Sequence, residues 1–154
     1  LYKNSLGEQA RGLPGSALRF PLSVHPPGGG FPLVRTILAI DDAADAMVFA
    51  GDIPSGSRVR MMRASQEDLI DGAAKAASHV QERGAELILC VSCVGRRLVL
   101  GQRIEEETEL VRDTLGGQPV MTGFYSYGEL APSAAGGSCQ LHNQTMTLTV
   151  LRES

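Results

Sequence analysis

A continuous apolar run at residues 86–94 constrains this chain more than any other feature of its sequence. After Glu86 its side chains are Leu, Ile, Val and Cys, interrupted by Ser92. The run is too short to span a membrane, which takes about 20 apolar residues. A short apolar run with β-branched residues is typical of a strand buried on both faces. We therefore predict a strand here, with other elements packed over it.

The segment before this strand, residues 66–83, has the periodicity of an amphipathic helix. Ser65 is predicted as its N-cap, and Asp68, three residues on, completes a capping-box pattern. Gly84 occupies the position where a helix often ends in a left-handed residue. Small side chains dominate the apolar face, which predicts a helix lying close on a sheet. That face comprises Leu69, Ala73, Ala76, Ala77 and Val80.

A second helix is predicted at residues 103–115, after the strand. Glu105, Glu106 and Glu107 lie in its first turns, where carboxylates interact favourably with the helix dipole. Glycines at residues 116–117 end it. The remaining strand-like segments are residues 20–24, 33–40, 46–49, 57–62, 119–127 and 144–151.

Together these segments predict an α+β fold in the order β-β-β-β-α-β-α-β-β. Two main helices are expected to pack on one face of a mostly antiparallel or mixed β-sheet. The short connections within residues 33–62 favour an antiparallel meander. A chain of 154 residues suits one hydrophobic core, so we predict a single domain over residues 1–154.

Charge and composition exclude several classes of function. The formal net charge is −3, from 14 basic and 17 acidic residues, whereas a nucleic-acid-binding surface needs an excess of basic residues. The absence of tryptophan and the 5% of aromatic residues argue against base-stacking surfaces. No apolar segment is long enough for a membrane span, and no secretory signal opens the sequence. With an odd number of cysteines, the sequence predicts a cytoplasmic protein without a disulfide framework.

The cysteines suggest two kinds of chemistry. Cys90 and Cys93, with Cys139 and His142, have the pair spacing of a Cys3His zinc site. Residues three apart in a strand point to opposite faces, however, which favours a buried structural thiol at Cys90 and no metal site. Cys93 ends the strand just before two arginines, which would lower the pKa of its thiol. A thiol-dependent enzyme using Cys93 is therefore one alternative.

Polar side chains suited to a small ligand follow several strands. Arg96 and Arg97 come after the apolar strand, where paired guanidinium groups can hold a carboxylate or a phosphate. They can equally pair with the glutamates at residues 105–107 on the surface. Hydrogen-bonding side chains are also dense at residues 123–129 and 141–145. These two stretches either line a polar pocket or satisfy buried backbone groups of the loops.

Four stretches of the chain resemble the C-terminal half of the FIST sensory domain, and the order and spacing hold from about residue 2 to residue 153. Tyr-Ser-Tyr-Gly-Glu at residues 125–129 and His-Asn-Gln-Thr at residues 142–145 are the most specific parts. Ser55 stands where an acidic residue is expected, and Cys90 and Cys139 are not part of the pattern. The stretches that carry the resemblance are residues 49–57, 92–97, 123–132 and 141–147.

The resemblance implies an intracellular signal-transduction sensory module that binds a small ligand, with an amino acid as the proposed class. It implies two partners, an N-terminal FIST half that is absent from this chain and a signalling output protein or domain. We expect no enzyme activity and no cofactor. Some members of the family are associated with haem and nitric oxide, so a haem-dependent gas-sensing module using His142 is a second alternative.

These features predict a ligand-binding site without catalytic residues or metal ligands. Arg96 or Arg97 would hold the carboxylate of an amino acid, and Glu129 would hold its ammonium group, because a dry pocket must pair both charges. Neutral side chains would add hydrogen bonds, and His142 would orient the ligand. The predicted ligand-binding residues are Arg96, Arg97, Tyr125, Tyr127, Glu129, His142, Asn143 and Gln144.

Overall fold

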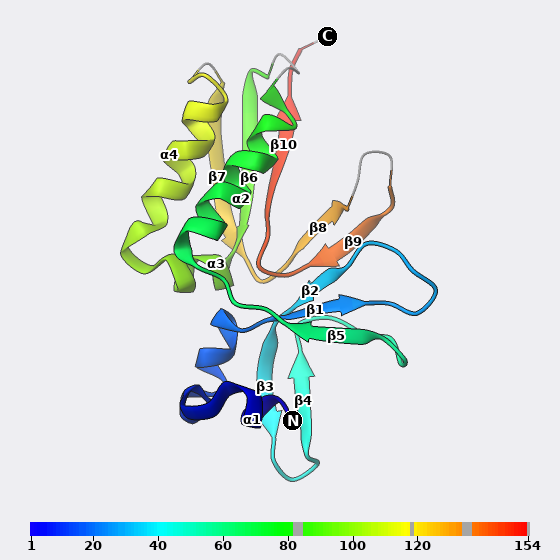
Figure 1. Cartoon of the computed structure of the whole chain (residues 1–154). Coiled ribbons are helices and arrows are strands. Elements are labelled where there is room, and N and C mark those ends of the chain that lie inside the picture. The colour runs from blue at the N-terminus through cyan, green and yellow to red at the C-terminus, as the bar shows by residue number, and fades with distance from the viewer. Residues whose placement is uncertain (82–84, 118, 134–136, 154) are drawn as a thin grey trace. The chain divides into compact units, whose positions relative to one another are not determined.

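The structure is a computed structural model that describes residues 1–81, 85–117, 119–133 and 137–153. The chain divides into two compact units, Leu1–Arg63 and Ala64–Ser154 (Figure 1). Both units combine helices with β-sheets, and among the described strands every pair but one is antiparallel. The predicted α+β class is therefore confirmed. The single domain expected from the sequence stays a prediction. None of the described helices is long and apolar enough to cross a membrane.

The first unit begins with short helical segments and continues with short strands. β1 lies in the middle of an antiparallel sheet of order β2-β1-β5, and β3 and β4 form a separate hairpin. The meander predicted for residues 33–62 is therefore wrong, because β5 pairs with β1 and not with β4. The elements are α1 (Tyr2–Leu6), η1 (Gly7–Gly12), η2 (Gly15–Arg19), β1 (Leu22–His25), β2 (Leu33–Arg35), β3 (Ile37–Asp41), β4 (Ala46–Phe49) and β5 (Arg58–Met61).

The core of the first unit explains why residues 33–40 form two strands. The chain leaves one sheet at Thr36 and enters the other, which brings Ile37 of β3 into the core. This core also takes the start of the chain, since the hydroxyl of Tyr2 donates a hydrogen bond to the carbonyl of Phe20 at 2.7 Å. Its buried members are Tyr2, Leu6, Ala17, Leu22, Val24 and Ile37.

The second unit is built around the apolar run, which forms the central strand of a sheet of order β10-β6-β7. β10 is antiparallel to β6, whereas β7 is parallel to it and follows a crossover through α3 and α4. β8 and β9 form an antiparallel hairpin. The elements are α2 (Gln66–Ser78), β6 (Leu87–Cys93), α3 (Val94–Leu100), η4 (Gly101–Arg103), α4 (Ile104–Thr114), β7 (Val120–Ser126), β8 (Glu129–Pro132), β9 (Cys139–His142) and β10 (Met146–Leu151).

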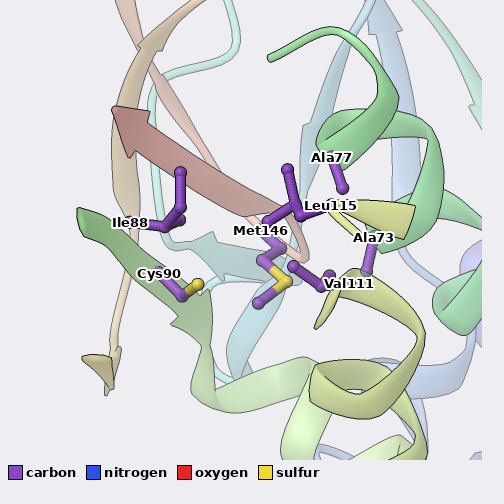
Figure 2. Packing of buried hydrophobic residues seen from close by; sticks show 7 residues of the cluster. All are labelled: Ala73, Ala77, Ile88, Cys90, Val111, Leu115 and Met146. Carbon is purple, nitrogen blue, oxygen red and sulfur yellow. The ribbon is translucent and has the colours of Figure 1, made fainter. Parts of the chain in front are cut away.

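Helices α2 and α4 pack on one face of this sheet, as predicted. The alanines of α2 let the helix approach closely, and their methyl groups meet the apolar side of α4 over β6 and β10 (Figure 2). The buried cluster consists of Ala73, Ala77, Ile88, Cys90, Val111, Leu115 and Met146. This face therefore carries the main core of the second unit.

The opposite face of β6 is less covered than the sequence predicts. Ile88 and Cys90 on the helix side are buried, whereas Leu87, Leu89 and Val91 on the other side are only half-buried. Side chains alternate between the two faces of a strand. A continuous apolar run therefore places apolar side chains on both faces, including a face that other elements cover only in part. The prediction of a strand buried on both faces is therefore wrong for the second face.

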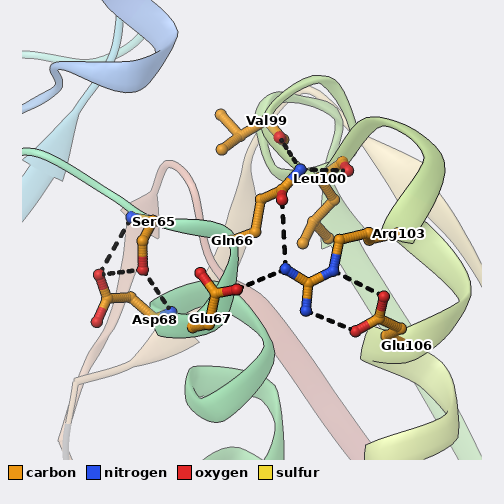
Figure 3. Close-up of polar contacts among 8 residues, drawn as sticks. All are labelled: Ser65, Gln66, Glu67, Asp68, Val99, Leu100, Arg103 and Glu106. Atoms are coloured by element: carbon orange, nitrogen blue, oxygen red, sulfur yellow. Dashed lines mark hydrogen bonds and ion pairs between the residues drawn. The ribbon is translucent and has the colours of Figure 1, made fainter.

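The start of α2 confirms the predicted capping box. The backbone N–H of Asp68 donates to Ser65 Oγ at 3.1 Å, and Asp68 Oδ2 accepts from the backbone N–H of Ser65 at 3.1 Å (Figure 3). These bonds satisfy N–H groups that a helix start leaves without partners. The helix ends at Ser78, earlier than the predicted residue 83. Gly84, predicted as the end of this helix, lies outside the described residues.

The start of α4 is tied to α2 by the side chain of Arg103. Its guanidinium donates to Glu106 at 2.7 Å and to Glu67 at 2.6 Å (Figure 3). Gln66, also on α2, donates to the carbonyl of Leu100 at 2.8 Å. These contacts hold the N-terminal ends of α2 and α4 beside each other, close to the end of α3.

Candidate functional site

A pocket of about 310 Å³ lies in the second unit, where α4 meets the sheet. Apolar side chains of β6, β7 and β10 form part of its wall, and hydroxyl groups and one arginine from α4 and the strands form the rest. We call it the α4–β7 pocket. It is lined by Cys90, Ser92, Glu107, Thr108, Arg112, Met121, Thr122, Gly123, Phe124, Tyr125 and Met146.

The lining of the pocket on β7 consists of consecutive residues, 121–125. Neighbouring side chains of a strand point to opposite faces of the sheet. A pocket confined to the helix side would therefore meet only every second side chain of β7. The unbroken run indicates that the pocket reaches the backbone of β7 at the edge of the sheet.

At Gly123 of β7 there is no room for a side chain beside β6. A Cβ atom added at Gly123 would lie 1.9 Å from the carbonyl oxygen of Cys90, its partner in the parallel ladder. No side chain fits at that distance without moving one of the strands. The pairing of the two strands at the pocket therefore depends on this glycine.

A buried ion pair lies beneath the pocket. Arg96 of α3, 4% exposed, pairs with Glu107 of α4, which is fully buried, and its Nε donates to Glu107 Oε1 at 2.6 Å. Ser92 of β6 donates to the other carboxylate oxygen at 3.1 Å. Arg96 also donates to the carbonyl oxygens of Leu69 at 2.6 Å and Gln144 at 3.4 Å. This one guanidinium thus links α2, α3, α4 and the segment before β10.

Arg97 takes a different direction from Arg96. It is exposed, and its guanidinium carbon lies 5.2 Å from the centre of the Tyr125 ring, a cation–π contact. Burial raises the pKa of the Tyr125 hydroxyl, and the negative charge of Glu107 adds to the rise. Tyr127, two residues on, is 88% exposed. Of the eight predicted ligand-binding residues, Tyr125 lines the α4–β7 pocket and the other seven do not.

The remaining predicted residues gather around the end of β6 and the start of β10. Glu129, 2% exposed, accepts hydrogen bonds from Ser126 Oγ and Thr145 Oγ1, both at 2.6 Å. The Asn143 side-chain amide donates to the carbonyl oxygen of His142 at 3.1 Å. Gln144 is buried and meets Arg96 through its backbone carbonyl.

The structure therefore brings Arg96, Glu129, Asn143 and Gln144 into one region, and their role in ligand binding stays a prediction. The side chains of Arg96, Glu129 and Asn143 bond to the Glu107 carboxylate, to hydroxyl groups or to backbone carbonyls. This matches the alternative in which these stretches satisfy buried groups of the loops. The surface pairing considered for the arginines is also corrected, since Arg96 does meet Glu107 but does so in the interior.

The burial of Cys93 opposes the low thiol pKa that was expected near two arginines. Cys93 is buried, and burial raises the pKa of its thiol instead of lowering it. Burial also raises the pKa of the Cys90 thiol to about 11, with a further contribution from Glu107. Cys139 is exposed at the start of β9. Burial therefore works against a thiolate at both Cys90 and Cys93.

His142, the residue considered as a haem ligand, is hydrogen-bonded through one ring nitrogen. Its Nε2 lies 2.9 Å from the carbonyl oxygen of Ala131 across the β8–β9 hairpin, so ligation would break that hydrogen bond. The α4–β7 pocket does not include this histidine. Within the described residues there is no group of three or more His, Cys, Asp or Glu side chains that could hold a metal ion. A haem iron at Nε2 of His142 would therefore have to displace the carbonyl of Ala131.

The part of the site on α4 was not predicted from the sequence. Thr108 and Arg112 are four residues apart, so they lie on the same face of a helix. Both line the pocket, and Glu107 forms its base. The spacing of Thr108 and Arg112 was the available signal, but exposed polar residues of a helix usually belong to a solvated face.

Comparison with known families identifies one match. A family model described as "FIST C domain" matches residues 1–132. This range covers the first unit and, in the second, the α4–β7 pocket apart from Met146. The His-Asn-Gln-Thr stretch at residues 142–145 lies beyond the match. No curated protein and no solved structure shows a detectable similarity to the chain.

Proposed function

Because the chain belongs to the FIST C domain family, a sensory-type domain of signal transduction, we propose that it binds a small carboxylate ligand in the α4–β7 pocket. The observation that carries this proposal is that the α4–β7 pocket is lined by an available arginine, several hydroxyl groups and apolar side chains. A volume of about 310 Å³ is at the small end of the range for ligand sites, about 300–1,000 Å³. An amino acid is a ligand of suitable size.

Arg112 is the residue proposed to hold the ligand carboxylate. Its side chain is exposed at the pocket, and no acidic side chain of the described residues lies within ion-pair distance of it. A guanidinium binds a carboxylate through two parallel hydrogen bonds. Arg96, the residue first expected in this role, already uses its guanidinium within the fold. The carboxylate of the ligand therefore goes to Arg112.

The other walls of the pocket suit the rest of an amino acid. The hydroxyl groups of Thr108, Thr122 and Tyr125 offer neutral donors and acceptors, to which an ammonium group can donate. Met121 and Met146 present flexible apolar surface to a side chain of the ligand. This combination of a few polar groups with apolar walls is typical of small-molecule sites.

The buried ion pair supplies a route from the ligand to the rest of the unit. Glu107 lies at the base of the pocket and is bonded to Arg96, which contacts α2 and the segment before β10. A ligand shifts a conformational equilibrium only when it binds one state more tightly than the other. We propose that occupancy of the pocket changes this contact and that an output domain or protein, or an N-terminal FIST half, senses the change.

Calorimetric titration with the twenty amino acids tests this function. At least one is expected to bind, and Arg112→Gln should weaken it about tenfold or more, since a charged hydrogen-bonding partner contributes about 1.5–3 kcal/mol. Arg60→Gln is the matched control, because Arg60 is exposed on β5 in the other unit. Binding that is equal in the Arg112 and Arg60 variants contradicts the proposed carboxylate contact, and binding that is absent for all amino acids contradicts the amino-acid ligand.

A further inference from the structure

β7 is an edge strand of its sheet, and its free edge borders the α4–β7 pocket. β7 pairs with β6 on one side, and no described strand pairs with the other. The backbone N–H of Val120 donates to the carbonyl of Glu86 at 2.9 Å. Alternate residues of a strand bond to the same neighbour. The backbone groups of Met121, Gly123 and Tyr125 therefore point away from β6, toward the free edge.

This edge lacks the features that usually prevent strand pairing. Edge strands are normally protected by charged side chains, proline, bulges or shortness. β7 has seven residues, contains no charged residue and no proline, and pairs with β6 without a shift of register. Phe124, with 60% of its surface exposed, adds apolar area beside the edge. Such a strand is suited to accept another extended chain.

The position of Arg112 indicates which part of an extended chain lies at the pocket. Arg112 is near the C-terminal end of α4, whereas Glu107, near its N-terminal end, contacts Ser92, the ladder partner of Tyr125. α4 therefore runs opposite to β7, and Arg112 lies toward the Met121 end. An extended chain whose final carboxylate pairs with Arg112 would run antiparallel to β7.

Building on the proposed function, we propose that the ligand class of this site is a short extended peptide with a free C-terminal carboxylate. The peptide backbone pairs with the free edge of β7 at Met121, Gly123 and Tyr125. Its last side chain, an apolar one, enters the pocket against Met121 and Met146, and its carboxylate binds Arg112. Strand addition supplies affinity through the backbone, and the pocket supplies preference for one side chain.

Charge favours this occupant over a second copy of β7. The strand Val120–Ser126 contains no carboxylate, so two copies paired edge to edge would leave Arg112 without an anion from either strand. A chain end brings a carboxylate together with backbone groups spaced for strand pairing. The C-terminus of a peptide therefore supplies backbone hydrogen-bonding groups to the free edge of β7 and a carboxylate to Arg112.

Titration with matched peptide mixtures tests the proposal on the whole chain. The probe is an N-acetylated tetrapeptide mixture with leucine, methionine or phenylalanine at the C-terminus and random residues elsewhere. We expect the best peptide isolated from it to bind at least about tenfold more tightly than the same free C-terminal amino acid, because several backbone hydrogen bonds are added. Amidation of its C-terminus, or N-methylation of the amides facing β7, should each remove about tenfold or more.

Two variants separate specific from incidental binding. Arg112→Gln should reduce binding of the free-acid peptide and leave that of the amidated peptide unchanged. Glu109→Gln, on the same helix but outside the pocket, is the matched control and should bind as the wild type does. A peptide that binds the Arg112 variant as well as the wild type overturns the proposed carboxylate contact.

The outcomes also distinguish this inference from the proposed function. If amino acids bind with the same affinity as peptides, or if N-methylation has no effect, the peptide inference is wrong and the small-ligand function stands. If peptides bind and amino acids do not, the peptide inference stands and the amino-acid ligand is wrong. If neither binds, both are wrong. Dimerisation that Phe124→Ser abolishes, without peptide binding, would assign the edge to a second copy.

Discussion

Two arginines of the second unit show how differently the same side chain is used. Arg96 is buried, and its guanidinium donates to Glu107 and to the carbonyls of Leu69 and Gln144. Arg112 is exposed at the α4–β7 pocket, without an ion-pair partner among the described residues. Arg96 therefore connects elements of the fold, whereas Arg112 is available to a ligand.

The same contrast separates the α4–β7 pocket from the polar region at the end of β6. In that region Glu129 and Asn143 are almost fully buried and hydrogen-bonded within the fold. A high density of polar side chains there reflects the need to satisfy buried groups. A binding site instead needs groups that remain accessible, and a sequence does not distinguish the two cases.

Breaking the buried ion pair should have the largest effect on stability. Arg96→Met leaves the Glu107 carboxylate buried without its cation, which typically costs about 3–5 kcal/mol. The free energy of unfolding, measured by urea denaturation followed by circular dichroism, should fall by that amount. A loss below about 1 kcal/mol would show that the pair behaves like an exposed one.

The double variant Arg96→Met with Glu107→Met is the control for the charge. Removing both partners leaves no uncompensated charge, and replacing a buried pair by apolar side chains is often neutral. The double variant should therefore be more stable than the single one. If it is less stable, the loss arises from packing and the carbonyl hydrogen bonds of Arg96, and not from the buried charge of Glu107.

Glu129 should show a smaller effect of the same kind. Its carboxylate joins Ser126 at the end of β7 to Thr145 before β10, with both hydroxyl groups donating at 2.6 Å. Glu129→Gln replaces two charge-assisted hydrogen bonds by neutral ones, and we expect a loss of about 2 kcal/mol in the same denaturation experiment. Tyr127→Ser, at an exposed position, is the control and should stay within about 0.5 kcal/mol of the wild type. An equal change in the two variants would place Glu129 outside the stabilising network.

The elements that sequence analysis located correctly are those with strong local signals. The apolar run formed β6, the capping box at Ser65 started α2, and the glycines at residues 116–117 ended α4 with positive φ angles. Each of these signals depends only on residues that are close together in the sequence. Pairing between distant segments has no such signal, and the interpretation of residues 33–62 as a meander therefore failed.

Two elements were missed because their sequences suggest something else. Helix α3 follows β6 without a loop, and Val94 and Gly95 look like the end of the strand. The β8–β9 hairpin lies in stretches whose glycines and polar residues are typical of loops. The pocket was missed for a related reason, since it depends on α4 meeting the edge of β7. Among its lining residues only Tyr125 had been predicted to bind the ligand, although Gly123 and Phe124 belong to the same stretch of the sequence.

Arg112 should contribute least to stability, which completes the comparison with Arg96. Arg112→Gln removes an exposed cation that has no ion-pair partner among the described residues. We expect the free energy of unfolding to change by less than about 0.5 kcal/mol, the usual range for such surface positions. The same variant should lose ligand binding, so one substitution separates binding from folding. A destabilisation above about 1 kcal/mol would mean that Arg112, like Arg96, is engaged within the fold, and the carboxylate site would then have to lie elsewhere.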